Sequence, residues 1–414
     1  MHGRRKFTPH VSPRVLQPEQ HAAKTCHARA VALVMVSAAC AFAAPVLAQE
    51  PAPAMATKPS ANYWVYVLAE SADLMHRIQF GPEGATVEKT IPVGLYPTET
   101  EGPHGIAISA DGKWLHMTTG HGLPDGGYWK YELGPDTVVG DFVPLGYFPA
   151  TIDVTPDGLY AFVVNFNLHG EHVPSSVSVV YTGDNVEVAR TTTCVMPHGS
   201  RMGRAGLFHY SACMMDDQLV ELDTRSFEVS RRFSVASGAE EPVVEDAHAG
   251  HVAGQAEEAG GMKHEPTCSP TWAQPSIDGK SIYVACNKSA EILEIGLDEW
   301  KLERRIETGR APYNLAASAD GRTLIATLKS AKSVEFFDLA AGESLGTAET
   351  STTVVHGVVI SPDSKYAFVS VEGVGAEPGK VDVFDIATRA RVASVEVGQQ
   401  AGGIAFWKME PPVR

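Results

Sequence analysis

The chain has 414 residues, of which 44% are hydrophobic and 20% are charged, and its formal net charge is −16. This composition is that of a globular protein and excludes a disordered or collagen-like chain. The excess of acidic side chains argues against nucleic acid and anionic membranes as partners, because both carry negative charge.

The N-terminal segment has the features of a secretory signal peptide. Basic side chains precede an uncharged, alanine-rich run over residues 30–49, which small residues close at Val46-Leu47-Ala48. We expect a signal peptide over 1–48, a flexible Pro/Ala-rich linker over 49–61, and a mature protein in the periplasm or outside the cell, free of the membrane. Arg4-Arg5 lies far from the apolar run, which favours a Sec-type over a twin-arginine signal. The alternative is a membrane anchor, since the run is nearly long enough to span a bilayer.

The rest of the chain repeats one sequence pattern. An Asp-Gly turn lies between two β-rich runs, as at Asp157-Gly158 before Leu159–Val164, and such turns are strong hairpin signals. A third and a fourth strand follow each hairpin, and the units recur at intervals of about 40–45 residues, which is the signature of a propeller blade. Units begin near residues 102, 148, 196, 269, 311 and 354.

A seventh blade is predicted from the two ends of this region. The run Ala401–Trp407 has the pattern of a lone first strand, and Tyr63–Leu68 with Met75–Ile78 supplies the missing strands. Joining them in one blade closes the ring and hides the sheet edges. The predicted fold is all-β, a seven-bladed β-propeller over 62–407 with four antiparallel strands per blade, followed by a C-terminal tail at 408–414.

The recurring motif resembles that of a known repeat family. It combines Pro-x-x-Ile/Leu-Ala-x-Ser-x-Asp-Gly, as in Pro312–Gly321, with runs such as Tyr283–Asn287 and Val381–Asp385. In these features the chain is similar to the YVTN-type (YncE-like) β-propeller repeat proteins over nearly all of the region after residue 48. The resemblance implies the fold. Its broad superfamily includes lactonase-like propellers, the amine dehydrogenase heavy chain and the nitrous oxide reductase propeller, which holds copper with histidines at one end. The chain has no match to that reductase's second, cupredoxin-like copper domain.

One repeat position collects histidines. At the start of each innermost strand, seven residues before the Asp-Gly turn, the units carry His104, Ala150, His198, Thr271, Tyr313, His356 and Gly402. Because innermost strands line the central channel, their starts converge on one mouth of it. Three imidazoles at that mouth are candidate metal ligands. The alternative is that a histidine at a strand start only hydrogen-bonds neighbouring backbone.

An acidic, histidine-containing insertion at 237–265 interrupts the repeat on the same face. Its His248, His251 and His264 are further candidate metal ligands if this loop closes over the channel mouth. The alternative is a flexible, solvated linker.

The candidate ligands suit several transition metals. Copper is the first expectation, because histidines and a nearby methionine occur in a periplasmic setting, and zinc is the second. The sequence has no c-type haem motif and no Gly-rich phosphate loop, so we expect neither haem nor a nucleotide. Candidate substrate contacts at the mouth are Arg201, Tyr313 and His121. For Arg201, the alternative is structural pairing with carboxylates.

The four cysteines after the predicted signal peptide predict two disulfides. Cys194 and Cys213 are placed almost symmetrically about one hairpin turn, and Cys268 and Cys286 about another. The members of each pair should therefore face each other across adjacent antiparallel strands. Export to an oxidising compartment favours bonding. The alternative is thiolate metal ligation at the same face.

These features leave three hypotheses for function. The first is a metal-dependent periplasmic or secreted protein, copper before zinc, that could be an oxidoreductase. The second is a non-catalytic propeller that binds a protein or a small ligand on its face. The third is a lactonase-like hydrolase, which the convergence of histidines rather than carboxylates disfavours. We expect a monomer whose partner is a small molecule or a periplasmic protein, and the sequence leaves open whether it is an enzyme.

Overall fold

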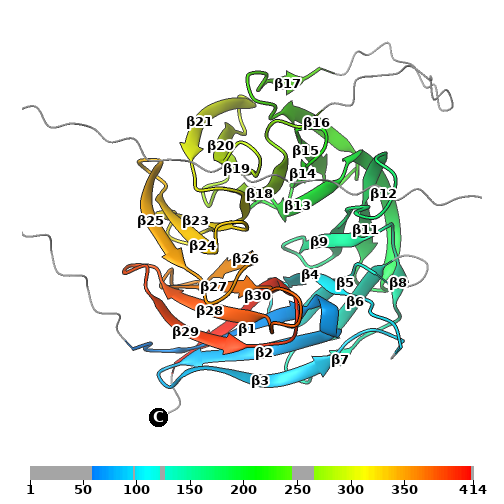
Figure 1. Ribbon diagram of the computed structural model, residues 1–414. Coiled ribbons are helices and arrows are strands. Elements are labelled where there is room, and N and C mark those ends of the chain that lie inside the picture. The colour runs from blue at the N-terminus through cyan, green and yellow to red at the C-terminus, as the bar shows by residue number, and fades with distance from the viewer. Residues whose placement is uncertain (1–57, 97, 122–125, 245–264, 412–414) are drawn as a thin grey trace, which may run out of the picture. The chain divides into compact units, whose positions relative to one another are not determined.

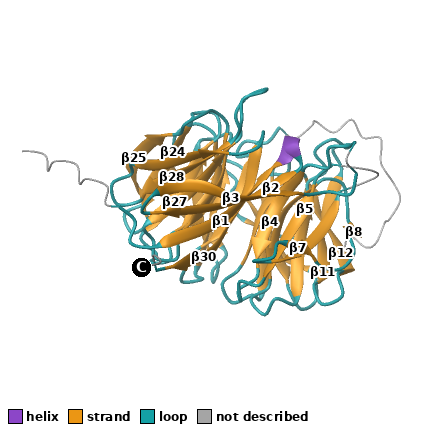
Figure 2. Ribbon diagram, turned by 90° about the horizontal axis from the view of Figure 1, so that it is seen from below, coloured by secondary structure: helices purple, strands orange, loops and turns teal. Residues whose placement is uncertain are grey.

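The computed structural model describes residues 58–96, 98–121, 126–244 and 265–411, and the expected signal peptide lies outside them. These residues form seven antiparallel sheets around a central axis (Figures 1 and 2), so the predicted seven-bladed β-propeller is confirmed. The one helical element in the described ranges is the 3-10 turn η1 (Glu70–Ala72). No helix in these ranges is long and apolar enough to cross a membrane.

The first strand of each blade lies innermost. The blades are numbered 1 to 7 in the order in which these innermost strands occur along the chain. Blade 1 consists of β4 (Pro103–Ile108), β5 (Trp114–Thr119), β6 (Gly127–Glu132), β7 (Thr137–Val138) and β8 (Val143–Pro144). Blade 2 consists of β9 (Pro149–Val154), β10 (Tyr160–Asn165), β11 (Pro174–Tyr181) and β12 (Val186–Val195). Blade 3 consists of β13 (Pro197–Met202), β14 (Phe208–Cys213), β15 (Gln218–Asp223), β16 (Val229–Ser234) and β17 (Pro242–Val243).

The other four blades follow the same order. Blade 4 consists of β18 (Pro270–Pro275), β19 (Ser281–Cys286), β20 (Glu291–Gly296) and β21 (Lys301–Glu307). Blade 5 consists of β22 (Pro312–Ala317), β23 (Thr323–Leu328), β24 (Ser333–Asp338) and β25 (Glu343–Glu349). Blade 6 consists of β26 (Val355–Ile360), β27 (Tyr366–Val371), β28 (Lys380–Asp385) and β29 (Arg391–Glu396). Blade 7 consists of β30 (Ala401–Glu410), β1 (Asn62–Ala69), β2 (Leu74–Gly81) and β3 (Gly84–Pro92).

Blade 7 joins strands from both ends of the propeller, as predicted. Its innermost strand β30 pairs antiparallel with β1 and also contacts β4 of blade 1 and β26 of blade 6, which closes the ring. The strand continues three residues past the expected boundary at 407, because Lys408–Glu410 still pairs with Asn62–Trp64. The ring is therefore closed by hydrogen bonds between distant parts of the sequence.

The predicted Asp-Gly turns are hairpins closed by a repeated side-chain hydrogen bond. In five blades a Ser or Thr hydroxyl donates to the Asp carboxylate two residues later, at 2.6–2.7 Å. The pairs are Ser109–Asp111, Thr155–Asp157, Ser276–Asp278, Ser318–Asp320 and Ser361–Asp363. The next residue has a positive φ, 69° at Gly112 and 75° at Gly158, which glycine adopts without a Cβ clash.

The apolar core lies between neighbouring blades. Between blades 6 and 7, for example, Tyr366 meets Tyr63 and Phe80 edge-on, with ring centroids 5.2 and 5.0 Å apart, and all three side chains are buried. Edge-to-face contacts are a favoured aromatic geometry. Because each blade packs against both of its neighbours, the innermost strands are held in fixed positions around the channel.

Both predicted disulfides are present. Cys194 is bonded to Cys213 and Cys268 to Cys286, with Cα–Cα distances of 5.9 and 4.5 Å. The expected position of Cys194, on a strand adjacent to the strand of Cys213, is wrong. Cys194 lies in β12, the outermost strand of blade 2, whereas Cys213 lies in β14 of blade 3. This bond therefore joins two blades at the point where the chain passes from β12 to β13. Two disulfides are typical of an oxidising, extracytoplasmic environment.

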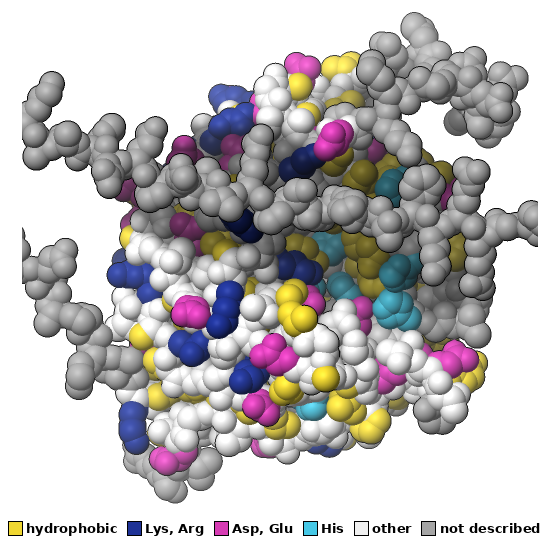
Figure 3. All heavy atoms as spheres, in the orientation of Figure 1, with side chains coloured by type: hydrophobic (Ala, Val, Ile, Leu, Met, Phe, Trp, Pro, Cys, Tyr) yellow, Lys and Arg dark blue, Asp and Glu magenta, His cyan; other side chains and the backbone are white. Residues whose placement is uncertain are grey.

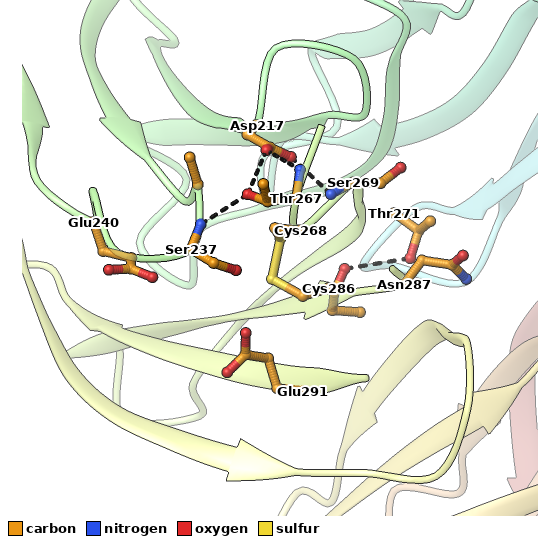
Figure 4. Close-up of a disulfide and its surroundings, with 12 residues drawn as sticks. Asp217, Ser237, Glu240, Thr267, Cys268, Ser269, Thr271, Cys286, Asn287 and Glu291 are labelled. Atoms are coloured by element: carbon orange, nitrogen blue, oxygen red, sulfur yellow. Dashed lines mark hydrogen bonds between the residues drawn. A yellow bond between two sulfur atoms is a disulfide. The ribbon is translucent and has the colours of Figure 1, made fainter. Parts of the chain in front are cut away.

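Figure 4 shows the second disulfide and the polar residues around it. The Asp217 carboxylate accepts hydrogen bonds from the main-chain N–H groups of Thr267 and Ser269, at 2.5 and 2.7 Å (Figure 4). Cys268 lies between these two residues and is bonded to Cys286. The carboxylate and the disulfide together anchor the chain where it enters blade 4.

The expected insertion at 237–265 begins as part of blade 3. Strand β17 pairs with β16, so residues 242–243 belong to the sheet and not to a loop. Residues 245–264 lie outside the described residues. The assignments of His248, His251 and His264 as metal ligands therefore stay predictions.

We expect the protein without residues 1–48 to contain no free thiol. Cys26 and Cys40 belong to the segment left out of that protein, and the other four cysteines are paired. A thiol titration of the denatured, unreduced protein measures this directly. The same sample after reduction is the control and should give four thiols per chain. A count of two or more before reduction would refute the pairing.

Candidate functional site

A strained backbone residue precedes every innermost strand. Each has a positive φ, between 49° and 64°. The seven residues are Gly102, Phe148, Met196, Ser269, Ala311, Val354 and Gln400. All but the first are non-glycine residues, for which such a conformation costs about 1–3 kcal/mol. The residue two positions later is in each case the repeat position singled out in the sequence, so the strained turn sets where that side chain enters the channel.

Four of these side chains meet in one cavity at the channel mouth. His104, His198, Tyr313 and His356 line a space of about 250 Å³. The three imidazoles are buried, with 7%, 1% and 6% of their surface exposed. A second, smaller space of about 30 Å³ lies farther along the innermost strands, on the other side of the three imidazoles. It has room for about one water molecule. Figure 3 shows histidine side chains (cyan) grouped near the centre of this face.

Main-chain carbonyl groups orient two of the three imidazoles. Nδ1 of His104 lies 2.9 Å from the carbonyl oxygen of Ala150, and Nδ1 of His198 lies 2.9 Å from that of Thr271. A carbonyl oxygen only accepts, so Nδ1 carries the proton in both rings. In the neutral ring Nε2 then has a free lone pair, the arrangement found in metal-binding histidines. The hydrogen bond from histidine to neighbouring backbone, which the structural interpretation of these residues predicted, is present in both rings. It uses Nδ1 and leaves Nε2 available to a metal ion.

The Tyr313 hydroxyl lies between two of the rings. Its oxygen is 3.0 Å from Nε2 of His198 and 3.4 Å from Nε2 of His356. The hydroxyl has one proton, so it donates to one ring at a time. Within the described ranges, no group of three or more His, Cys, Asp or Glu side chains is close enough as it stands to hold a metal ion. The inserted hydroxyl explains the spacing between these two rings.

The rings are nevertheless near the spacing that a shared ion requires. The ring centroid of His104 is 5.6 Å from that of His356 and 6.5 Å from that of His198. Two imidazoles on one tetrahedral ion, with bonds of about 2.1 Å, have ring centres about 5 Å apart. The His104 ring is therefore within about 1.5 Å of this spacing from each of the other two rings.

Burial keeps two of the imidazoles neutral. It lowers the pKa of His198 to about 3. It also lowers the pKa of His356 well below its usual value, with a further contribution from the charge of Lys329. The neutral imidazole is the form that binds a metal ion. These two rings therefore stay competent as ligands at neutral and mildly acidic pH.

A second repeat position lies at the same end of the channel, and five of its seven residues line the cavity. Each directly follows the second strand of its blade, and its N–H donates to the carbonyl of the strained residue before the first strand. The seven are Glu70, Gly120, Phe166, Met214, Asn287, Lys329 and Glu372. The three charged residues, Glu70, Lys329 and Glu372, were not predicted from the sequence. The position could have been found there, because it is the residue that follows the second strand of each repeat.

Glu70 connects an inner histidine with an outer one. One carboxylate oxygen is 3.9 Å from Nε2 of His104, and the other is 3.2 Å from Nε2 of His121. Burial acts to raise the pKa of Glu70, but these two imidazoles and Lys329 lower it below its usual range. The His121 ring stacks on His169 with centroids 5.4 Å apart, and about a third of its side chain is exposed. A charged carboxylate thus links the cavity to its rim.

Lys329 supplies a positive charge beside Tyr313. Its ammonium nitrogen is 4.1 Å from the centre of the Tyr313 ring and 3.2 Å from a carboxylate oxygen of Glu372. Burial acts to lower the pKa of Lys329, but Tyr313 and Glu372 together raise it above its usual value. Glu372 also lies 3.8 Å from Nε2 of His356. The wall therefore offers carboxylates to two of the three histidines.

Arg201 lies in the narrow part of the channel, below the histidines. Its guanidinium carbon is 4.4 Å from the centre of a Trp272 ring, and it donates to the Ser200 carbonyl at 2.9 Å. Burial lowers the pKa of Arg201, and the charge of Asp153 opposes that shift. These contacts support a structural role for the guanidinium. The assignment of Arg201 as a substrate contact stays a prediction.

No family model and no curated protein matches this sequence. Solved structures of the same fold do match. The periplasmic gluconolactonase of Pseudomonas aeruginosa is 16% identical with a TM-score of 0.62, covering 85% of this chain and 100% of that one. A Desulfotomaculum acetoxidans protein of unknown function is 17% identical with a TM-score of 0.58, covering 83% and 98%. The hydrazine synthase of Kuenenia stuttgartiensis is 13% identical with a TM-score of 0.55, covering 78% and 96%.

These likenesses show the fold alone, because all three identities are low. The resemblance to YVTN-type repeats is not confirmed by them and stays a prediction.

Proposed function

We propose that this chain is a periplasmic metal-binding propeller that holds one divalent transition-metal ion on Nε2 of His104, His198 and His356. The observation that carries the proposal is the convergence of these rings, two of them with Nδ1 bonded to main-chain carbonyls. The carboxylates of Glu70 and Glu372 lie within 4 Å of His104 and His356 and favour a cation in the cavity. The net charge of −16 adds a long-range attraction for cations.

Zinc is favoured over copper for this site, the reverse of the order expected from the sequence. Three imidazoles that meet from different directions, with carboxylates nearby, are a donor set typical of tetrahedral zinc. A soft thioether donor would favour Cu(I), and Met214 lines the cavity wall, where it packs against an apolar cluster that includes Phe148 and Phe166. The residues present therefore fit Zn²⁺ well and Cu²⁺ less specifically.

Metal analysis of protein purified from the periplasm tests the proposal. We expect stoichiometric zinc, and calorimetric titration of the chelator-stripped protein should restore one tightly bound ion per chain. Cu²⁺ binds most nitrogen sites more tightly than Zn²⁺ in vitro, so relative affinities measured by titration do not identify the natural metal. The ion that the protein retains on purification identifies it. Protein that neither retains nor takes up either metal would overturn the proposal.

A lactone hydrolase is the second candidate, since one solved structure of this fold is named a gluconolactonase. An ion held by three imidazoles with an open fourth position lowers the pKa of a bound water to about 7. Hydrolysis of aldonolactones by the metal-loaded protein, absent after chelation, would favour this function over simple binding.

A further inference from the structure

The fourth position of the proposed metal site faces a tyrosine. In a tetrahedral site with bonds of about 2.1 Å, neighbouring donor atoms are about 3.4 Å apart. The Tyr313 oxygen is 3.0 Å from Nε2 of His198 and 3.4 Å from Nε2 of His356. It therefore already lies at the separation expected of a ligand from two other ligands of the same ion.

We infer that Tyr313 is the fourth metal ligand and binds through its hydroxyl oxygen, completing a site formed with His104, His198 and His356. This inference rests on the proposed metal site. On binding, the O–H bond breaks, the oxygen–metal bond forms, and the proton passes to water. The step therefore needs no further reactant.

Two carboxylates compete for the same role, and both are less well placed. Glu70 is 3.9 Å from Nε2 of His104, and Glu372 is 3.8 Å from Nε2 of His356. Each approaches only one of the three proposed histidine ligands, and each is already engaged, Glu70 by His121 and Glu372 by Lys329. Tyr313 approaches two histidines at shorter distances.

Burial raises the pKa of the Tyr313 hydroxyl, and the charge of Lys329 opposes that shift. The Lys329 ammonium lies 4.1 Å from its ring centre and stabilises negative charge there. The side chain is 8% exposed, so water competes weakly for the oxygen. A tyrosine that closes the fourth position leaves no place for a reactive water, and sites with four protein ligands hold a metal without catalysing a reaction. The inference therefore favours a binding or carrier role over the hydrolase.

Ultraviolet difference spectroscopy during Zn²⁺ titration tests this directly. We expect the wild-type protein to develop the absorption band of ionised tyrosine in proportion to bound metal, up to one tyrosine per chain. Tyr313→Phe should lose the band and bind Zn²⁺ at least about 10–100-fold more weakly, since loss of a direct ligand should cost at least as much as loss of an outer-shell partner. The wild-type spectrum needs no variant, so the test survives if Tyr313→Phe does not fold.

Tyr128→Phe is a matched control. The Tyr128 hydroxyl also bonds a buried histidine, lying 2.8 Å from Nδ1 of His116, but in blade 1 and away from the cavity. This variant should keep both the band and the affinity. Metal binding without the band, with equal affinity in Tyr313→Phe, would overturn this inference and leave the proposed function standing. A wild-type protein that binds no metal would overturn both.

Discussion

Replacing His198 by alanine is expected to weaken Zn²⁺ binding by at least about 100-fold, since loss of a direct ligand should cost at least as much as loss of an outer-shell partner. Of the three histidines, His198 is the most buried, and its ring is fixed by Thr271 on one nitrogen and Tyr313 on the other. Alanine removes a donor and also leaves the Tyr313 hydroxyl without its nearer acceptor. Competition with a chromophoric chelator measures the affinity.

His116→Ala is the matched control for this variant. His116 is equally buried and bonded to a tyrosine, but it belongs to β5 and does not line the cavity. Both variants should lose stability, and only His198→Ala should lose metal affinity. Equal affinities in the two variants would exclude His198 as a ligand.

The metal-free protein is expected to lose stability steeply as the pH falls from about 6.5 towards 3. Burial lowers the pKa of His116, His198 and His209 to about 3 in each case, whereas a histidine in the unfolded chain titrates near about 6.5. Between these values the unfolded chain binds protons that the folded chain does not. Each such histidine therefore lowers the free energy of unfolding by about 1.4 kcal/mol per pH unit of acidification.

His209→Phe isolates one of these contributions. The His209 ring is fully buried, stacks on Phe162 at 5.2 Å, and has no hydrogen-bond partner for either nitrogen among the described residues. Phenylalanine keeps the stacking and cannot be protonated. Urea unfolding at several pH values should show a slope smaller by about 1.4 kcal/mol per pH unit, with greater stability at neutral pH because two unpartnered polar atoms are gone.

A control for this variant is His172→Phe, because His172 is exposed. An exposed imidazole has nearly the same surroundings in the folded and unfolded chains, so its removal should leave the slope unchanged. If His209→Phe also left the slope unchanged, the acid sensitivity would have to come from other groups.

Local sequence rules were sufficient to predict the strands and turns of each blade. The Asp-Gly turns and the alternation of apolar residues around them predicted the hairpins, and the Ser–Asp or Thr–Asp hydrogen bonds in five blades supply the physical reason. The composite blade followed from counting units, because a closed ring removes unpaired edges. The predicted boundary at 407 was three residues short, since the pairing of β30 with β1 is a long-range contact that local pattern does not contain.

The cavity was predicted only in part. The histidines at positions 104, 198 and 356 share a repeat position, so their convergence followed from the fold. Glu70, Lys329 and Glu372 share a different position, on the wall, and were missed because no histidine marks it. The placement of Cys194 was also misjudged, because symmetry about a turn does not reveal to which blade the first cysteine belongs.

The sequence by itself determined the number of blades, the pairing of the four cysteines and the repeat position that faces the channel, because each depends on spacing along the chain. Only the tertiary structure decided that Tyr313 reaches His198 and His356, and that Glu70 reaches His104. These contacts join side chains of different blades. Their distances depend on how far each blade is rotated about the channel axis, which the packing between blades sets and no repeat within the sequence encodes.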